Sequence, residues 1–485
     1  MSLSAALSNA VSGLGATSRQ LSVTSGNIAN ALTPGYAARG VTLGADAASG
    51  GVRVLSTDRT SDPVLTALRR EADAETAGAS ILAAGTARLA SALGELGDDG
   101  GLQAAATRFD GALRALADTP SSAPLQDAAA RAAGDLATSF NSAAEAANAL
   151  RSETDAEIAR VVGRVNAATE EIASLNRSIV RASASGQATA GFIDRREQLI
   201  DEVNGAVAVT VTPGEAGTVT LRTREGALLV GRAARPISFT ATPVVSPGQE
   251  YAGGTGALSG LTIDGVDITP AGPGAQSVRT GALTGLFALR DEAVPRLIDG
   301  LDGAAADLVS RFEAVTDPTL APTDAALFTD AGARLSPPIA PGLAGRLSVN
   351  VAIDPGAGDP ARLRDGLGAT AAGAAGDDTL LRDLVDALSD LTTAPGTPAA
   401  DGPLDFRSRL AALSADASAR RVDAEAGQSA ADAARLDLAD AEGAVIGVDQ
   451  DRELERLVRL EQAYAANAQV IRTASAMLDE LTRLQ

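Results

Sequence analysis

The sequence predicts a mainly α-helical protein with a central β insertion, in which the two ends of the chain form a terminal α-helical coiled coil. Three observations favour this fold class. Apolar residues recur at alternating spacings of three and four near both ends, which places them on one stripe of a helix. The stretch 125–185 contains no proline and carries the same spacing in its second half. Short β-rich runs separated by glycine-containing turns begin only at about residue 206.

The first predicted helix ends near Asn30, just before a turn. The apolar seam of this helix consists of Leu3, Leu7, Ala10, Leu14, Thr17, Leu21, Thr24 and Ile28. Pro34 and Gly35 occupy the central positions of a predicted type II turn, and Thr33, which precedes the proline, is biased towards an extended conformation. Tyr36 either caps the apolar end of the helix or contacts a neighbouring subunit, and both interpretations stay open.

The last predicted helix begins at about Asp449 and carries a second seam. Its members are Leu457, Leu460, Tyr464, Asn467, Ile471, Ala474, Leu478 and Leu481. Asn467 either sets the register of a coiled coil or faces solvent where the stripe drifts around the helix. Chain ends usually fray, and a helix with so narrow a stripe buries little against one small domain. We therefore expect the two ends to pair side by side and to serve assembly.

The elements between the two ends follow in the order helices, strands, helices. A short extended passage after the turn has apolar residues at Val41, Leu43, Val52, Val54 and Leu55. Helices are predicted over 63–119 with a break at 97–101, over 125–185 with possible bends at Gly134 and Gly163, and over 193–203. Strands are predicted at 206–211, 218–223, 227–230, 237–241, 261–269 and 347–353. Further helices are expected over 283–314, interrupted or started afresh at Pro295, and over 379–391 and 404–442.

This order divides the chain into three predicted domains, because the β part is inserted between helical segments that are distant in sequence. Residues 1–60 with 443–485 form a terminal coiled-coil domain. Residues 61–205 with 283–442 form a helical bundle domain, and residues 206–282 form a small β domain.

The composition excludes several function classes. The net charge is −21, with 61 acidic against 40 basic residues and no Lys/Arg cluster, so nucleic acid and anionic membrane surfaces are poor partners. The chain contains no His and no Cys, which removes the usual metal ligands, the histidine base and the thiolate nucleophile. We expect no catalytic, cofactor-binding or metal-binding residues. No apolar run reaches the roughly 18 residues needed to cross a bilayer, so membrane insertion is not expected.

Both ends of the chain resemble known signatures. The segment Ser25–Tyr36, with the letters SGNIANALTPGY, is similar to the N-terminal signature of bacterial flagellar rod, hook and hook-associated proteins. The closing stretch from Gly447 to Leu478 resembles the C-terminal signature of the same axial families. The two signatures lie at opposite ends, in the order that those families have.

Interior segments narrow the resemblance to one family. Rod and hook proteins lack a long helical region after the N-terminal signature. This chain has such a region and resembles the hook-associated protein 1 family, the hook–filament junction proteins, at 171–176, 192–202, 285–292 and 326–332.

The resemblance implies a non-enzymatic structural subunit that joins hook to filament by ring assembly through its terminal helices. The implied partners are further copies of the chain, the hook protein, the second hook–filament junction protein and an export chaperone that grips the C-terminal helix. The implied location is extracellular, in the flagellum, after export by the flagellar secretion apparatus without a cleaved signal peptide. The expected interface consists of the large seam residues, Asn467, Asn30 and the turn residues 33–36. A hook or distal-rod subunit, or an adhesin on an axial scaffold, remains an alternative.

Overall fold

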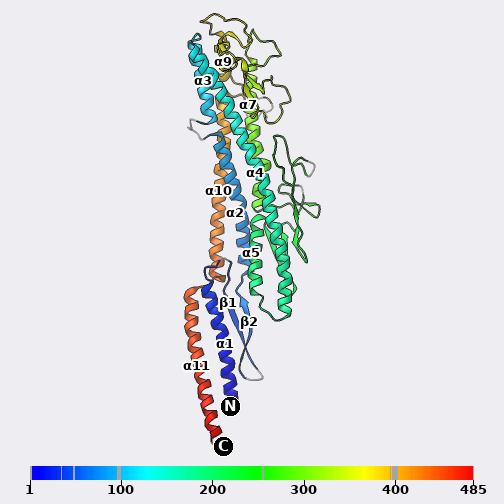
Figure 1. Cartoon of the computed structure of the whole chain (residues 1–485), viewed down its shortest axis with the longest axis vertical. Helices are drawn as coiled ribbons and strands as arrows, with labels where there is room; N and C mark the ends of the chain where they lie inside the picture. The colour runs from blue at the N-terminus through cyan, green and yellow to red at the C-terminus, as the bar shows by residue number, and fades with distance from the viewer. Residues whose placement is uncertain are drawn as a thin grey trace.

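The protein is a long rod with both termini at one end (Figure 1). The computed structural model describes residues 3–33, 35–46, 50–94, 100–253, 256–272, 274–393, 395 and 402–483, with the backbone alone for 481 and 482. The terminal helices occupy one end, a helical body extends away from them, and most of the short strands lie along the side of the body. The predicted mainly α-helical fold with a central β insertion is confirmed.

The first and last helices lie side by side, as the two seams predict. Helix α1 spans Leu3–Ala29, and α11 spans Gln450–Arg483. Between α1 and the body, β1 (Arg39–Ala45) and β2 (Val52–Arg59) form an antiparallel hairpin that lies against α1. The passage predicted to be extended is therefore a hairpin. We call α1, β1, β2 and α11 the terminal unit.

The body is built on long helices. They are α2 (Pro63–Leu93), α3 (Leu102–Asp118), α4 (Ala123–Ala184), α5 (Ala190–Ala206), α7 (Val294–Ala314), α9 (Thr379–Ser389) and α10 (Phe406–Ile446). Helix α2 begins with a proline in its first turn, and the Asp62 carboxylate accepts hydrogen bonds from the backbone N–H groups of Val64 and Leu65. Helix α4 runs unbroken for 62 residues. The bends that Gly134 and Gly163 would permit are absent, because the neighbouring elements pack along the whole of one face of α4.

The central strands form two small antiparallel sheets. Strands β3 (Val209–Pro213), β4 (Val219–Thr223) and β5 (Leu228–Val230) make the first, and β6 (Ile237–Ser238), β7 (Thr262–Ile263) and β8 (Val266–Asp267) make the second. The prediction of one strand over 261–269 is wrong. Asp264 and Gly265 both adopt positive φ, 49° and 81°, which is the geometry of a two-residue hairpin turn.

After the insertion, one prediction is confirmed and one is corrected. The helical stretch predicted over 283–314 consists of α6 (Ala282–Ala288) and α7 joined by a π-helical segment, Leu289–Ala293. Pro295 lies in the first turn of α7, which agrees with a fresh start of the helix at this proline. The strand predicted over 347–353 ends at Val349. There β10 (Leu347–Val349) pairs with β9 (Phe328–Asp330), and the Asn350 side chain then caps a short 3-10 turn. A four-residue helix, α8 (Arg362–Asp365), precedes α9.

Two hydrophobic cores hold the body together. One joins α3, the first half of α4, α7, α9 and the start of α10, and it includes the rings of Phe109, Phe312 and Phe328, which meet in tilted and edge-to-face arrangements. The other joins the second half of α4, with Ile158, Val165 and Ile172 fully or almost fully buried, to α5, α6 and the central strands. The strands of 206–282 therefore share their core with helices of the body. Neither core includes a residue of the terminal unit.

Candidate assembly surface and the joint behind it

The predicted seam of α1 faces inward along its whole described length. Leu3, Leu7, Leu14, Leu21 and Ile28 are half-buried. Between them Ala10, Thr17 and Thr24 are buried against α11 or the hairpin. The buried positions carry small side chains, so α1 approaches its neighbours closely.

The seam of α11 is covered only in part. Leu460 and Ala474 are buried, and Leu457, Asn467 and Ile471 are half-buried. Tyr464 and Leu478 remain 41% and 37% exposed. The side chain of Leu481 lies outside the described residues. Of the two predicted seams, that of α11 thus retains solvent-facing apolar area within a single chain.

Asn467 packs directly over a glycine of the partner helix. A Cβ atom added to Gly13 would lie 3.2 Å from both the Nδ2 and the Oδ1 atoms of Asn467, which is closer than most real contacts. The neighbouring Gly15 has open space around it. Gly13 therefore provides the room that the Asn467 amide occupies between α1 and α11, and the two residues fix where the helices meet.

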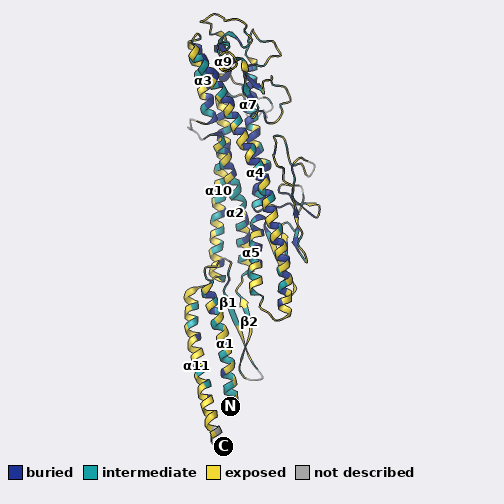
Figure 2. Ribbon diagram, in the orientation of Figure 1, coloured by how far each residue is buried: buried dark blue, intermediate teal, exposed yellow. Residues whose placement is uncertain are grey.

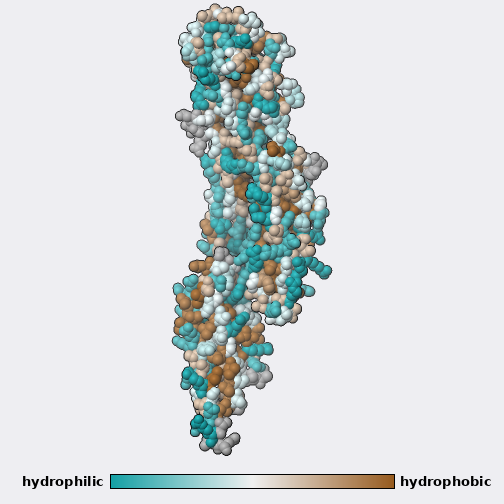
Figure 3. Space-filling view, in the orientation of Figure 1, coloured by the Kyte–Doolittle hydropathy of each residue, from teal (hydrophilic) through white to brown (hydrophobic). Residues whose placement is uncertain are grey.

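Helix α11 also exposes apolar side chains outside its seam. Four of them are about half-exposed: Leu454, Val458, Val470 and Met477. Figure 2 shows that most of the surface of α11 is exposed, and Figure 3 shows apolar patches over the terminal unit. On α1, Val11 is 54% exposed. Nothing in the described part of the chain covers these side chains, and they form an unpartnered apolar surface along the terminal helices.

The turn after α1 has the hydrogen bond that belongs to the predicted type II turn. The backbone N–H of Tyr36 donates to the carbonyl oxygen of Thr33, and Gly35 has a φ of 78°, as the third residue of a type II turn requires. Pro34 lies outside the described residues. Thr33 and Gly35 are exposed, whereas Asn30 is half-buried and donates through its side chain to the Gly26 carbonyl oxygen.

The residue that organises this turn is Asn27, which was not among the predicted site residues. Asn27 is fully buried. Its Nδ2 atom donates to the carbonyl oxygen of Arg39 at 2.9 Å and to Oε1 of Glu453 at 3.2 Å. Its Oδ1 atom accepts from the Tyr36 hydroxyl at 2.9 Å and from the Arg39 N–H at 3.0 Å. One side chain thereby links α1, the turn, β1 and α11.

Tyr36 is half-buried at the same place, and the Arg39 guanidinium lies 5.0 Å from the centre of its ring. Burial raises the pKa of Tyr36, with the Arg39 charge opposing this change and the carboxylates of Asp194 and Glu453 adding to it. The hydroxyl therefore stays protonated and remains a donor to Asn27. Within a single chain, Tyr36 closes the end of α1, as the first of the two sequence interpretations expects.

An ion-pair network lies on the body side of the joint. Arg69 of α2 pairs with Glu442 of α10 and with Asp201 of α5, and Arg70 donates to Asp201 at 2.6 Å and to Glu197 at 2.9 Å. Burial alone would lower the pKa of Arg69, but the carboxylates of Asp201, Glu442 and Asp73 outweigh it and raise the pKa. The network therefore keeps its charges and joins three helices at the base of the body.

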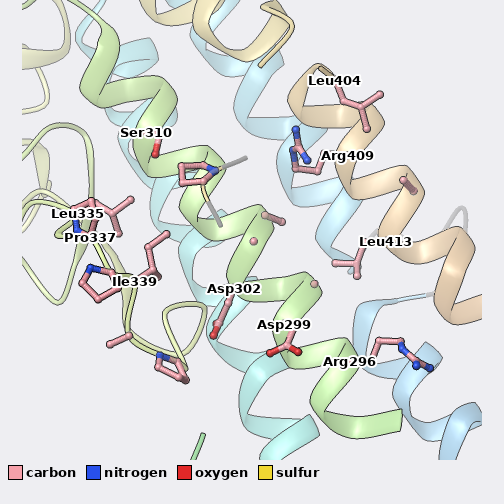
Figure 4. A pocket seen from close by; sticks show the side chains of 18 of the residues that line it. Arg296, Asp299, Asp302, Ser310, Leu335, Pro337, Ile339, Leu404, Arg409 and Leu413 are labelled. Atoms are coloured by element: carbon pink, nitrogen blue, oxygen red, sulfur yellow. The ribbon is translucent and has the colours of Figure 1, made fainter. Parts of the chain in front are cut away.

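A groove of about 1200 Å³ lies between α7, α10 and the loop 335–341 (Figure 4). Its polar side chains already serve the fold. Asp302 accepts from the backbone N–H groups of Gly342 and Ala344, and Arg409 donates to the buried carboxylate of Asp307 at 2.9 Å. The groove lacks a nucleophile with a neighbouring base.

Within the described ranges, no group of acidic side chains is arranged to hold a metal ion. No helix in the part of the chain that the structure describes is both long enough and apolar enough to cross a bilayer.

Comparisons with known proteins identify the family. A model of the flagellar hook-associated protein FlgK helical domain matches residues 86–320. Models of the flagellar basal body rod protein and of the C-terminal region of the basal body rod FlgEFG proteins match residues 7–36 and 445–484. The chain is a FlgK-like hook-associated protein. It is therefore a structural component of the bacterial flagellum, and the resemblance inferred from the two end signatures is confirmed.

A solved structure of the flagellar hook junction protein FlgK from Burkholderia pseudomallei also matches, with 20% sequence identity and a TM-score of 0.44. The match covers 54% of this chain and 46% of that protein, so this chain spans less than half of its length. The comparison with curated protein sequences finds no match.

Proposed function

We propose that this hook-associated protein joins the hook to the filament by assembling as a ring of copies through its terminal helices. The observation that carries the proposal is the uncovered apolar surface of α11, with Tyr464 and Leu478 in the seam and Val458 and Met477 beside it. Exposed apolar side chains that their own chain leaves uncovered are typical of surfaces that contact another protein. Neighbouring copies in a ring would cover these side chains.

The same surface supports the proposed partners. The hook protein on one side and the second junction protein on the other would contact the ring, and the export chaperone would grip α11 before assembly. A helix that depends on partners for burial can be held by a chaperone first and by neighbouring copies later. The proposed location is extracellular, in the flagellum, after export by the flagellar secretion apparatus.

In this proposal, each of the three predicted domains has its own role. Residues 1–60 with 443–485 would assemble, residues 61–205 with 283–442 would form the body, and residues 206–282 would lie outward as the β domain. The absence of terminal-unit residues from both hydrophobic cores supports a separate role for the chain ends.

Substitution in the α11 seam tests the proposal. We expect Leu478→Asp to leave a folded monomer, because this side chain is already 37% exposed. Cells that carry the variant should export it but should bear hooks without filaments and release filament protein into the medium. Ile471→Asp should act in the same way. Thr473→Asp, on an exposed position of the same helix, is the matched control and should support filaments.

Electron microscopy of cells and detection of the secreted variant separate assembly from export. Full-length filaments on cells with exported Leu478→Asp, or on cells from which the gene is deleted, would overturn the proposal. Filament loss with Thr473→Asp to the same extent would show that any acidic residue on α11 blocks function, which would also contradict the assigned surface.

A further inference from the structure

The terminal unit meets the body across a narrow joint. Helix α11 packs on α1, and α1 packs on α11 and the hairpin, while the helices of the body pack on one another. The chain crosses the joint twice, between β2 and α2 and between α10 and α11. One backbone hydrogen bond bridges these crossings, from the N–H of Ala38 to the carbonyl oxygen of Ile446 at 2.9 Å. The terminal unit thus continues along the long axis of the body and is connected to it by two segments of chain (Figure 1).

The side chains that bridge the joint converge on one carboxylate. Arg39 and Arg59 are direct partners in the ladder of the hairpin, at the end nearest the body. Both approach Asp194, which lies in the first turns of α5: Arg39 through NH2 and Arg59 through Nε, which is 3.2 Å from Oδ1. The three side chains are 26%, 22% and 15% exposed. Both strands of the hairpin are therefore anchored to the body through the same acidic group.

An open cleft lies beside this contact. It has a volume of about 870 Å³ and lies between the hairpin and turn on one side and α2, α5, α10 and the strands β3 and β4 on the other. Val219 of the body's core lines it on the body side, whereas the terminal unit and its turn contribute Gly35, Tyr36 and Arg59, none of which has a large aliphatic side chain. Gly35 approaches the side chain of Gln198 across the joint. Because the terminal side adds so little apolar surface here, the directional charged contacts contribute strongly to the resistance of the joint to bending.

We propose that Arg39, Arg59 and Asp194 form a latch that sets the angle between the terminal unit and the body. With the latch closed, the hairpin is fixed to the start of α5 and the two parts form one straight rod. Without the Asp194 charge, the two arginines repel each other, the hairpin detaches from α5, and the terminal unit swings about the two chain crossings. The consequence for assembly rests on the proposed function: in a ring, the latch would set the direction in which each body leaves the terminal helices.

The latch can be tested on the full-length monomer, independently of assembly. The native chain has no cysteine, so Ala430→Cys on α10 and Ala466→Cys on α11 give a clean pair of spin-label sites. Both positions are exposed, and the helical rise places them on the order of 50 Å apart. Pulsed electron paramagnetic resonance of the doubly labelled chain measures the distribution of this distance.

We expect one narrow distance peak for the parent pair and a shifted, broadened distribution in the Asp194→Asn background. Arg39→Gln combined with Arg59→Gln should broaden it in the same way. Glu171→Gln is the control. Glu171 of α4 pairs with Arg195, which lies on α5 next to Asp194, so this change removes one ion pair of α5 without removing a residue of the latch. Circular dichroism verifies that each variant keeps its helices.

An unchanged distribution in both latch variants would overturn the proposal, and so would equal broadening with Glu171→Gln. A straight, rigid Asp194→Asn chain that still fails to support filaments would refute the latch and leave the proposed assembly function intact. A flexible Asp194→Asn chain supports the latch even if Leu478→Asp turns out to support filaments.

Discussion

Replacement of Asn27 by alanine should loosen the whole terminal unit, not only the turn in which Asn27 lies. The Asn27 side chain makes four hydrogen bonds, to both backbone groups of Arg39, to the Tyr36 hydroxyl and to the Glu453 carboxylate. A typical net value is about 1 kcal/mol for each, with a larger cost where a buried group is left unpaired. Water can reach the half-buried Tyr36 and Arg39 after the change, so we expect a total loss of roughly 2–4 kcal/mol.

Native-state hydrogen exchange is the appropriate assay, because local opening of one part of a long protein is not visible in a global unfolding curve. A loss of roughly 2–4 kcal/mol raises the opening equilibrium by roughly 30- to 1,000-fold. The informative peptide covers 450–464 in α11, since it is distant in sequence and is hydrogen-bonded to Asn27 through the Glu453 carboxylate. Its exchange should accelerate together with that of the hairpin.

Asn30→Ala is the matched control, an asparagine in the same signature. Its Nδ2 atom donates to the Gly26 carbonyl oxygen, one turn earlier, and its Oδ1 atom accepts a long bond of 3.4 Å from the exposed Thr33 hydroxyl, so its loss should cost about 0.5–1 kcal/mol. If Asn27→Ala accelerates exchange only near Arg39 and leaves α11 unchanged, Asn27 does not couple the two ends of the chain. Equal effects of the two substitutions would refute the reasoning as well.

Two further predictions concern packing at defined places. Gly13→Leu should push α1 and α11 apart at Asn467 and destabilise the terminal unit by roughly 1–3 kcal/mol, whereas Gly15→Leu, which points into open space, should have little effect; hydrogen exchange of α11 distinguishes them. Asp155→Ala should destabilise the body by roughly 2–4 kcal/mol, because it removes a buried ion pair from Arg290, which keeps its pair with Asp291, and leaves the Thr242 N–H without its acceptor. Glu153→Ala removes an exposed ion pair and should cost at most about 1 kcal/mol, and the thermal unfolding midpoints of the two variants should differ accordingly.

The sequence predicts the helices well where their pattern is local. The spacing of Ile158, Val165 and Ile172 is a property of a short window, and these residues are buried in α4 as expected. Periodicity also identifies the inward faces of α1 and α11. It cannot tell how completely a seam is covered, because that depends on the neighbours of each helix, and Leu478 remains exposed while Leu460 is buried.

The polar organisation of the joint could not be predicted in the same way. Asn27 and Glu453 are 426 positions apart, and Arg39 and Asp194 are 155 apart, so no spacing rule connects them. The split of 261–269 was within reach, since Asp264-Gly265 is a known hairpin turn pair. The π-helical segment before Pro295 has no comparable signal, because it depends on how α6 and α7 pack against α2 and α4.

The two parts of the molecule are stabilised by different means, and this difference bears on assembly. The body has two apolar cores with fully buried phenylalanine, leucine and isoleucine side chains. Among the described side chains of the terminal unit, those that α1 buries are small or polar, and the buried apolar side chains of α11 are Leu460 and Ala474. Each ordered residue costs about 1–2 kcal/mol of backbone entropy, whereas a fully buried leucine contributes about 1.5–3 kcal/mol. A helix pair with so few buried large side chains gains less from burial than the body does. Neighbouring copies that cover Tyr464, Leu478 and Met477 would add burial, so under the proposed function the ring stabilises the terminal unit beyond what a single chain provides.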